Sequence, residues 1–193
     1  MTRRIVIIQG HPDTDPRHLC HALADAYAAG AAEAGHEVRR IDVAWLHFPW
    51  IRNKDEFDSG KVPAAIREAQ ASIRWADHLV IVFPLWLGSL PSLLKAFLEQ
   101  TLRPNFAMKM EPGKFPKKLL QGRSARIIVS MGMPALVYRW FYRAHGIKNL
   151  QRNILRFCGI RPVRTTLIGM VESTADGHGP GLDRVRALGK RGH

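Results

Sequence analysis

The chain has 193 residues, 46% of them hydrophobic and 23% charged, which predicts one globular domain over residues 1–193 and excludes the disordered and fibrous classes. Its net charge of +13 is spread over scattered Lys and Arg residues without a recognition module, so we predict no nucleic-acid partner. Two cysteines give neither a disulfide framework nor a C-x-x-C pair, and no apolar run could cross a bilayer, so we predict a cytoplasmic protein that is not a transmembrane protein.

Strand and helix patterns alternate along the whole chain. Runs of β-branched and apolar residues predict strands, and alanine-rich or helically periodic stretches predict helices. In chain order we predict a strand at 4–9, a helix at 16–34, a strand at 37–43, a helix at 62–76, a strand at 78–83, a helix at 91–102, a loop at 103–121, a strand at 124–131, one or two helical stretches within 136–158 broken at Gly146, a strand at 163–168, and a short helix at 183–188 in a peripheral tail of about 172–193.

This alternation predicts an α/β fold with a doubly wound, five-stranded parallel sheet of order 2-1-3-4-5 and helices on both faces. In such a sheet the ligand binds outside the carboxyl ends of the strands. We therefore expect the functional site in the loops that follow residues 4–9, 78–83 and 124–131.

The loop after the first strand contains Asp15 and Pro16, a favourable pair for the start of a helix. We expect the unpaired backbone N–H groups of Arg17, His18 and Leu19 to point toward the end of that strand. With the positive end of the helix dipole and the Arg17 and His18 side chains, they predict a site for a phosphate. A plain capped turn is the alternative. The loop contains neither the G-x-G-x-x-G nor the G-x-x-x-x-G-K-[ST] motif.

The loop after the third strand is apolar and aromatic, although it lies where ligands bind. It consists of Pro84, Leu85, Trp86, Leu87 and Gly88. A flat ring system would explain this composition, with the backbone N–H groups of Trp86 to Gly88 meeting the polar edge of the ring. Alternatively, Trp86 is a core or dimer-interface residue.

The loop after the fourth strand contains Gly132, which lets the backbone approach a ring closely. Farther along, Tyr138, Tyr142 and His145 could offer hydroxyl and imidazole groups to a bound substrate. Aromatic residues at this spacing also commonly pack a helix.

Metal binding and serine hydrolysis are two other classes to weigh. His11, His18, Cys20 and His21 lie close together in the sequence, but their spacing is not that of a structural zinc site and no H-E-x-x-H is present. The chain also lacks G-x-S-x-G. We therefore predict no metal centre and no serine nucleophile.

Three segments together resemble the flavodoxin-like NAD(P)H:quinone oxidoreductases, including small bacterial members related to ancillary subunits of potassium efflux systems. The matching segments are Gly10-His11-Pro12 with Arg17 and His18, Phe83-Pro84-Leu85-Trp86 continuing to Pro91, Leu93, Leu94 and Lys95, and Phe157-Cys158-Gly159-Ile160. The resemblance covers nearly the whole chain and implies a flavodoxin-like fold, a tightly bound FMN or FAD, and a homodimer with its site near the interface.

The resemblance also implies which residues hold the flavin. Its phosphate would lie near His11, Arg17, His18 and Leu19, and its ring near Pro84, Leu85, Trp86, Leu87 and Gly88 and near Ser130, Met131, Gly132 and Met133. Three departures stand out. This chain has Ser130 to Met133 where family members often carry Thr-Thr-Gly-Gly, and a single Trp86 where they often carry Gln-Trp. Cys20 replaces a polar residue that can touch the phosphate.

The expected activity is transfer of two electrons from NADH or NADPH to a quinone or similar small acceptor, with donor and acceptor using one pocket in turn. Tyr142 and His145 are the candidate donors of a proton or hydrogen bond to the acceptor. The alternative is a flavin-bearing regulatory subunit that docks on a membrane potassium efflux transporter. A flavodoxin-type electron carrier is a third hypothesis, which the basic charge of the chain disfavours.

Overall fold

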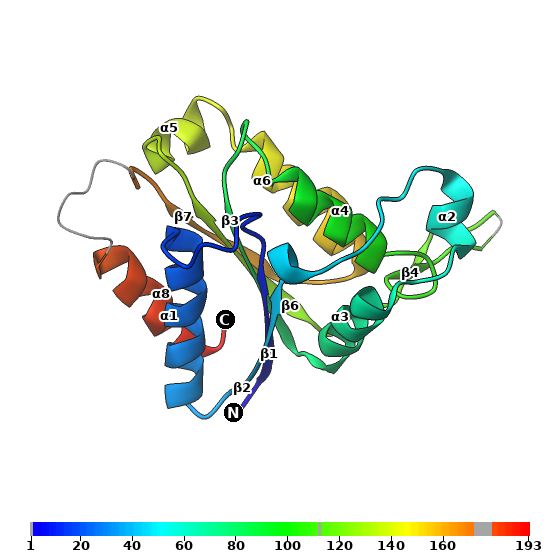
Figure 1. Cartoon of the computed structure of the whole chain (residues 1–193), viewed down its shortest axis with the longest axis horizontal. Coiled ribbons are helices and arrows are strands. Elements are labelled where there is room, and N and C mark those ends of the chain that lie inside the picture. The colour runs from blue at the N-terminus through cyan, green and yellow to red at the C-terminus, as the bar shows by residue number, and fades with distance from the viewer. Residues whose placement is uncertain (1, 112, 172–178) are drawn as a thin grey trace.

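The computed structural model describes residues 2–111, 113–171 and 179–193 (Figure 1). Part of the predicted tail, residues 172–178, therefore lies outside the described residues. Among the described helices, none combines the length and the apolar character that a membrane span requires.

Five parallel strands form the main sheet in the order β2-β1-β3-β6-β7. In chain order they are β1 (Arg4–Gln9), β2 (Glu37–Asp42), β3 (His78–Pro84), β6 (Ser124–Ser130) and β7 (Val163–Ile168). Because β6 and β7 are the fourth and fifth strands of this sheet along the chain, the predicted order 2-1-3-4-5 is confirmed. The predicted loop at 103–121 additionally contains a small antiparallel pair, β4 (Met108–Lys109) with β5 (Lys117–Lys118).

Helices cover both faces of the sheet. They are α1 (Leu19–Glu33), the 3-10 turn η1 (Val43–Trp45), α2 (Lys54–Ser59), α3 (Ala64–Trp75), α4 (Ser92–Thr101), α5 (Ala135–Trp140), α6 (His145–Asn149), the π-helical segment η2 (Leu150–Leu155), α7 (Arg156–Cys158) and α8 (Gly179–Arg191). Figure 1 shows α1 and α8 on one face and α3, α4 and α6 on the other. The central strands β1 and β3 thus lie between two helical layers, as their nearly continuous apolar sequences require.

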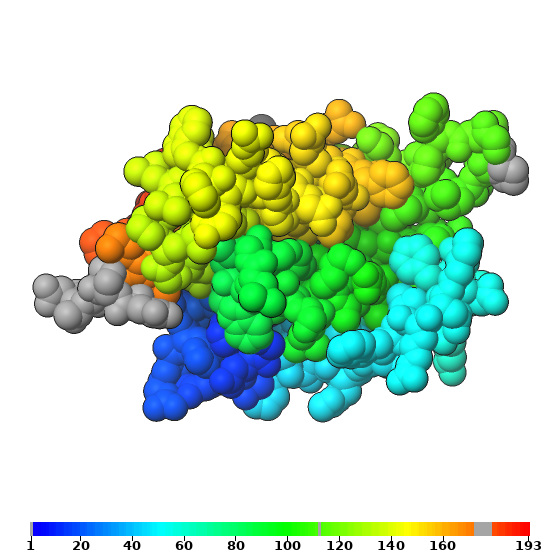
Figure 2. Space-filling view, turned by 90° about the horizontal axis from the view of Figure 1, so that it is seen from above, coloured from blue at the N-terminus to red at the C-terminus, as the bar shows by residue number. Residues whose placement is uncertain are grey.

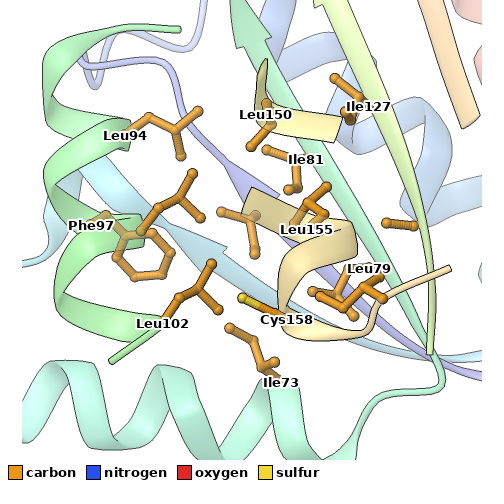
Figure 3. Packing of buried hydrophobic residues seen from close by; sticks show 14 of the residues in the cluster. Ile73, Leu79, Ile81, Leu94, Phe97, Leu102, Ile127, Leu150, Leu155 and Cys158 are labelled. Atoms are coloured by element: carbon orange, nitrogen blue, oxygen red, sulfur yellow. The ribbon is translucent and has the colours of Figure 1, made fainter. Parts of the chain in front are cut away.

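Alternate residues of each strand contribute to two apolar clusters. Ile5 and Ile7 belong to the cluster beneath α1 and α8, whereas Val6 and Ile8 belong to the larger cluster on the opposite face. Figure 3 shows part of the larger cluster, where residues of α4 and of the segment from η2 to α7 pack over β3 and β6. Burying this apolar surface on both faces is the main stabilising contribution to the fold.

Helices α1 and α8 approach each other backbone to backbone. A methyl group added at Gly30 would lie 2.0 Å from the carbonyl oxygen of Arg186, and one added at Gly189 would lie 2.2 Å from that of Tyr27. Val185, one residue before Arg186, is fully buried. The helix predicted at 183–188 is therefore longer than expected, because its packing against α1 supports additional turns.

Two further helix boundaries differ from the sequence prediction. Helix α1 begins at Leu19 rather than at residue 16. The break predicted at Gly146 instead falls at 141–144, where Arg143 and Ala144 have positive φ angles of 53° and 51°. Gly146 lies inside α6, where its lack of a side chain serves the close packing described below.

Candidate functional site

The carboxyl ends of β1, β3 and β6 bring the three predicted loops together. Figure 2 looks onto this edge and shows the blue loop after β1, the green loop after β3 and the yellow-green segment after β6 side by side. Backbone bonds continue from the sheet into the loops. The N–H of Gly10 donates to the oxygen of Val82 over 2.7 Å, and the N–H of Leu85 donates to that of Ser130 over 2.8 Å. The loops are therefore fixed to one another by the strands they follow.

Asp13 organises the loop after β1 by contacting three histidines. Its carboxylate accepts from Nε2 of His18 over 2.9 Å, its carbonyl accepts from Nε2 of His21 over 2.9 Å, and its N–H donates to Nδ1 of His11 over 3.1 Å. The His11 and His18 rings stack with centroids 4.1 Å apart. Burial and these neighbouring rings lower the pKa of His11, so its ring is held neutral. Sequence reasoning missed Asp13, since no motif marks it.

Asp15 does not act as the expected helix cap. Its side chain accepts from the N–H of Arg17 over 2.9 Å and its carbonyl accepts from the N–H of His18 over 3.3 Å. The prediction that both groups would be free for an anion is therefore wrong, because a turn at 16–18 uses them before the helix begins. Because α1 begins at Leu19, the N–H groups of Leu19 and Cys20 lie in its first turn. No carbonyl of the helix lies a full turn before them, so none can accept their hydrogen bonds. The side chain of Arg17 is exposed and forms an ion pair with Asp15.

The loop after β3 is a tight hairpin turn. Trp86 and Ser89 exchange backbone hydrogen bonds of 3.0 and 2.9 Å, and the two residues between them, Leu87 and Gly88, have φ angles of 46° and 76°. This is the backbone of a type I′ turn. The expectation that the Trp86 N–H meets a ring is therefore wrong. The turn instead projects side chains outward, with Trp86 half exposed and Leu87 wholly exposed.

Residues of α5 and α6 hold this turn from behind. The hydroxyl of buried Tyr138 donates to the carbonyl of Gly88 over 2.9 Å. A methyl group at Gly146 would lie 2.2 Å from the same oxygen and 2.8 Å from the Cα of Ser89. Tyr138 is therefore a support for the turn, and Gly146 is the position that lets α6 reach it. The close approach across the chain explains why sequence periodicity alone did not reveal this role for Gly146.

The loop after β6 presents backbone rather than side chains. Ser130 and Met131 are buried, Gly132 is exposed and Met133 is half-buried. The Ser130 hydroxyl lies 3.1 Å from the sulfur of Cys20, and burial raises the pKa of the Cys20 thiol to about 12. Cys20 is therefore a protonated core group that links α1 to β6.

The two candidate hydrogen-bond donors to an acceptor lie on the outer side of the same region. Tyr142 is half exposed and its ring meets that of Phe141 edge to face, with centroids 5.1 Å apart. His145 is exposed at the start of α6, one residue before Gly146. A hollow of about 710 Å³ lies beside them, lined in part by Arg139, Trp140 and Lys148. None of the predicted flavin-binding residues lines this hollow.

The fold and this site place the chain in a family. Residues 3–187 match the family model described as having a flavodoxin-like fold. The chain belongs to this family, which confirms the resemblance found in its sequence.

The chain is also similar to individual proteins and to solved structures. The chain is 27% identical to an uncharacterized NAD(P)H oxidoreductase of Haemophilus influenzae, over 89% of this chain and 86% of that one. It is 26% identical to the FMN-dependent NADH:quinone oxidoreductase 9 of Burkholderia lata, over 96% and 94%. It spans only about half, 49%, of the human ribosyldihydronicotinamide dehydrogenase that it also matches. The solved NAD(P)H:quinone oxidoreductase of Methanothermobacter marburgensis has the same fold, with a TM-score of 0.81, 19% identity and coverage of 99% and 97%.

Proposed function

We propose that the chain is an FMN-dependent NAD(P)H oxidoreductase that passes two electrons to a quinone or similar small acceptor by a ping-pong mechanism. The observation that carries this proposal is the meeting of three loops at the carboxyl edge, beside the first turn of α1. The names of the Haemophilus and Burkholderia relatives support the reaction class, and the latter favours FMN over FAD.

The phosphate end of FMN fits the start of α1. The free N–H groups of Leu19 and Cys20 lie at the positive end of a 15-residue helix. His18, whose Nε2 is bonded to Asp13, and the exposed guanidinium of Arg17 supply donors on the outer side. Arg17 would exchange its Asp15 partner for the phosphate, which costs little because the pair is exposed.

The ring end fits the two loops beyond it. The turn at 86–89 is rigid, because its own backbone bonds and Tyr138 hold it, and it presents the apolar surface of Trp86. Gly132 offers a backbone without a side chain on the other side. The turn at 86–89 would cover one face of a flat, amphipathic ring, and the backbone around Gly132 would donate hydrogen bonds to its polar edge.

When bound, the flavin supplies the redox chemistry, and the protein supplies orientation and hydrogen bonds. We assign no covalent role to any side chain. Tyr142 and His145 are exposed next to the turn and are proposed to donate a hydrogen bond or proton to the acceptor.

We also propose a homodimer that covers part of this region. Large apolar side chains gather on α5 and the neighbouring turn, where Leu87, Leu136, Trp140 and Phe141 are all mostly exposed. Exposed apolar patches of this kind mark interaction surfaces. Light scattering should then give twice the chain mass of 21.8 kDa, and Phe141→Ser should lower it toward that of the single chain.

The central experiment combines an absorption spectrum with an FMN titration. Purified protein should be yellow or bind added FMN, and should oxidise NADH or NADPH with a soluble quinone. His18→Gln should weaken FMN binding about tenfold, since a charge-assisted hydrogen bond contributes about 1.5 kcal/mol. His47→Gln, at an exposed histidine outside the three loops, is the matched control and should leave it unchanged. A protein that binds neither FMN nor FAD would contradict the proposal.

The acceptor role has its own test. Replacing Tyr142 by Phe and His145 by Gln together should lower the turnover of quinone while leaving FMN affinity intact. Unchanged quinone turnover would show that neither residue serves the acceptor.

A further inference from the structure

Basic side chains also gather at the opposite edge of the sheet, at the amino ends of the strands. A hollow of about 280 Å³ opens there, lined among others by Arg3, His78, Ser124, Arg164 and His193. Four of these five residues are Arg or His, and they come from β3, β6, β7 and the two ends of the chain. This hollow shares no residue with the candidate flavin site.

The register of the sheet places these groups on one face. His78 pairs with Ser124, and Arg126 pairs with Arg164. Paired residues of neighbouring parallel strands point to the same face, so buried Arg126 and exposed Arg164 lie side by side on the face of the sheet that carries α1 and α8. Like charges in adjacent positions repel, and this repulsion is strongest where water is excluded.

Two buried side chains in this region have unused hydrogen-bonding atoms. His78 is 1% exposed, and its Nδ1 lies 2.7 Å from the Ser124 hydroxyl, whereas its Nε2 has no partner among the described residues. Arg126 is 6% exposed, and its guanidinium donates to the hydroxyl of Thr166 over 2.8 Å. Its Nε has no hydrogen-bond partner in the described part of the chain. Unpaired buried polar atoms are rare in folded proteins and point to a missing partner.

The charges acting on His78 have one sign. Burial and, to a smaller extent, the charges of Arg3 and Arg126 together lower the pKa of His78 to about 3. Arg126 in turn faces the positive charges of Arg164 and, from α8, of Arg191 and Arg184. No Asp or Glu lines the hollow within the described chain.

Two carboxylates near the amino edge serve other partners. Asp77 is bonded to Arg4 over 2.7 Å at the outer side of the sheet, and Glu33 on α1 is paired with Arg186 and Lys190 of α8. Neither of these two carboxylates therefore balances the positive charge of the hollow.

We propose that this hollow is a binding site for a small oxyanion of the phosphate class, either free phosphate or the terminal phosphate of a small metabolite. Arg164 and Arg3 would bind it from the open side. Nε2 of His78 has no exposed surface in this structure, so it would donate a hydrogen bond to the anion only after the wall of the hollow shifts, while the Ser124 hydroxyl donates to Nδ1. The volume accommodates a phosphate together with a short organic group. The anion would neutralise the paired arginines and satisfy the buried imidazole.

The test is calorimetric titration of the full chain with inorganic phosphate at pH 7, against sodium chloride at equal ionic strength. It is run with and without saturating FMN, so that binding here is separated from binding at the start of α1. Arg164→Gln should weaken phosphate binding at least tenfold. Arg152→Gln, which removes an exposed arginine on η2 outside the hollow, should change it less than twofold.

Equal effects of the two variants, or binding that chloride abolishes at equal ionic strength, would overturn the proposal. A second readout follows the imidazole signals by NMR, in which the His78 ring should shift on addition of phosphate. A shift confined to His18 and His21 would place the anion at the carboxyl edge instead and would also overturn it. Glycerol phosphate and acetate serve as competitors, and acetate binding as strongly as phosphate would exclude the phosphate class.

Discussion

The two edges of the central sheet handle charge in opposite ways. At the carboxyl edge, acidic and basic side chains pair within a few residues of the sequence, since Asp13 is hydrogen-bonded to His18 and Asp15 forms an ion pair with Arg17. At the amino edge, Arg126 and Arg164 lie side by side without a described acidic partner. A loop can bend to pair its own side chains, whereas a strand fixes its side chains on one face. The charged side chains of the first edge therefore pair among themselves, whereas those of the second do not.

The largest effect is expected from breaking the support of the carboxyl edge. Gly146→Ala places a methyl group 2.2 Å from the carbonyl oxygen of Gly88 and should lower the free energy of unfolding by about 3 kcal/mol, because backbone on both sides must move. Gly179→Ala makes the same chemical change where no atom lies within 4 Å. Urea unfolding of both variants measures the difference, and equal stability would show that the turn is not held by this contact.

Acid should destabilise the amino edge through His78. The His78 imidazole titrates near 3 when folded and near 6.5 when unfolded, so the unfolded chain binds more protons between these values. Stability contributed by neutral, buried His78 is therefore present above pH 6.5 and falls as the pH is lowered. The loss should reach about 2 kcal/mol between pH 7 and pH 5.

Urea unfolding in phosphate-free buffer at both pH values measures this loss. His78→Gln should remove the His78 contribution, whereas exposed His47→Gln should keep the wild-type difference. An identical pH dependence in all three proteins would mean that His78 does not titrate on unfolding.

The smallest effect concerns a single hydrogen bond. Tyr138→Phe leaves the Gly88 carbonyl without its 2.9 Å donor and should lower the free energy of unfolding by about 1 kcal/mol. Tyr142→Phe, at a half-exposed tyrosine on the same segment, should leave stability unchanged. Thermal unfolding of the two variants compares them directly, and a matching loss in both would assign the effect to something other than this bond.

The strands and their order could be predicted from the sequence because burial on both faces leaves a strong local pattern. β1 and β7 have the predicted bounds, and β3 extends by one residue to Pro84. Helix ends were less predictable, since the choice between a cap and a turn at Asp15 depends on which backbone groups the side chain reaches in three dimensions.

The candidate site also has features that could be predicted from the sequence and features that could not. The loops that meet at the site could be predicted from the sequence, because the order of the strands determines which loops lie at the same edge of the sheet. The sequence did not reveal that Asp13 binds His18 and His21, or that Gly146 packs on Gly88, because these contacts depend on close approach between side chain and backbone. The paired arginines of the amino edge were also invisible, since Arg126 and Arg164 are 38 residues apart and only the sheet register joins them.

The glycine contacts between α1 and α8 have a consequence for how this chain can vary. Because Gly30 meets the backbone of Arg186 and Gly189 meets that of Tyr27, neither position can enlarge unless the helices separate. A related sequence that carries a larger residue at one position should therefore show a shifted α8, and selection should act on the two glycines as a pair. Their joint presence in another sequence would indicate that its last helix lies against its first at the same spacing.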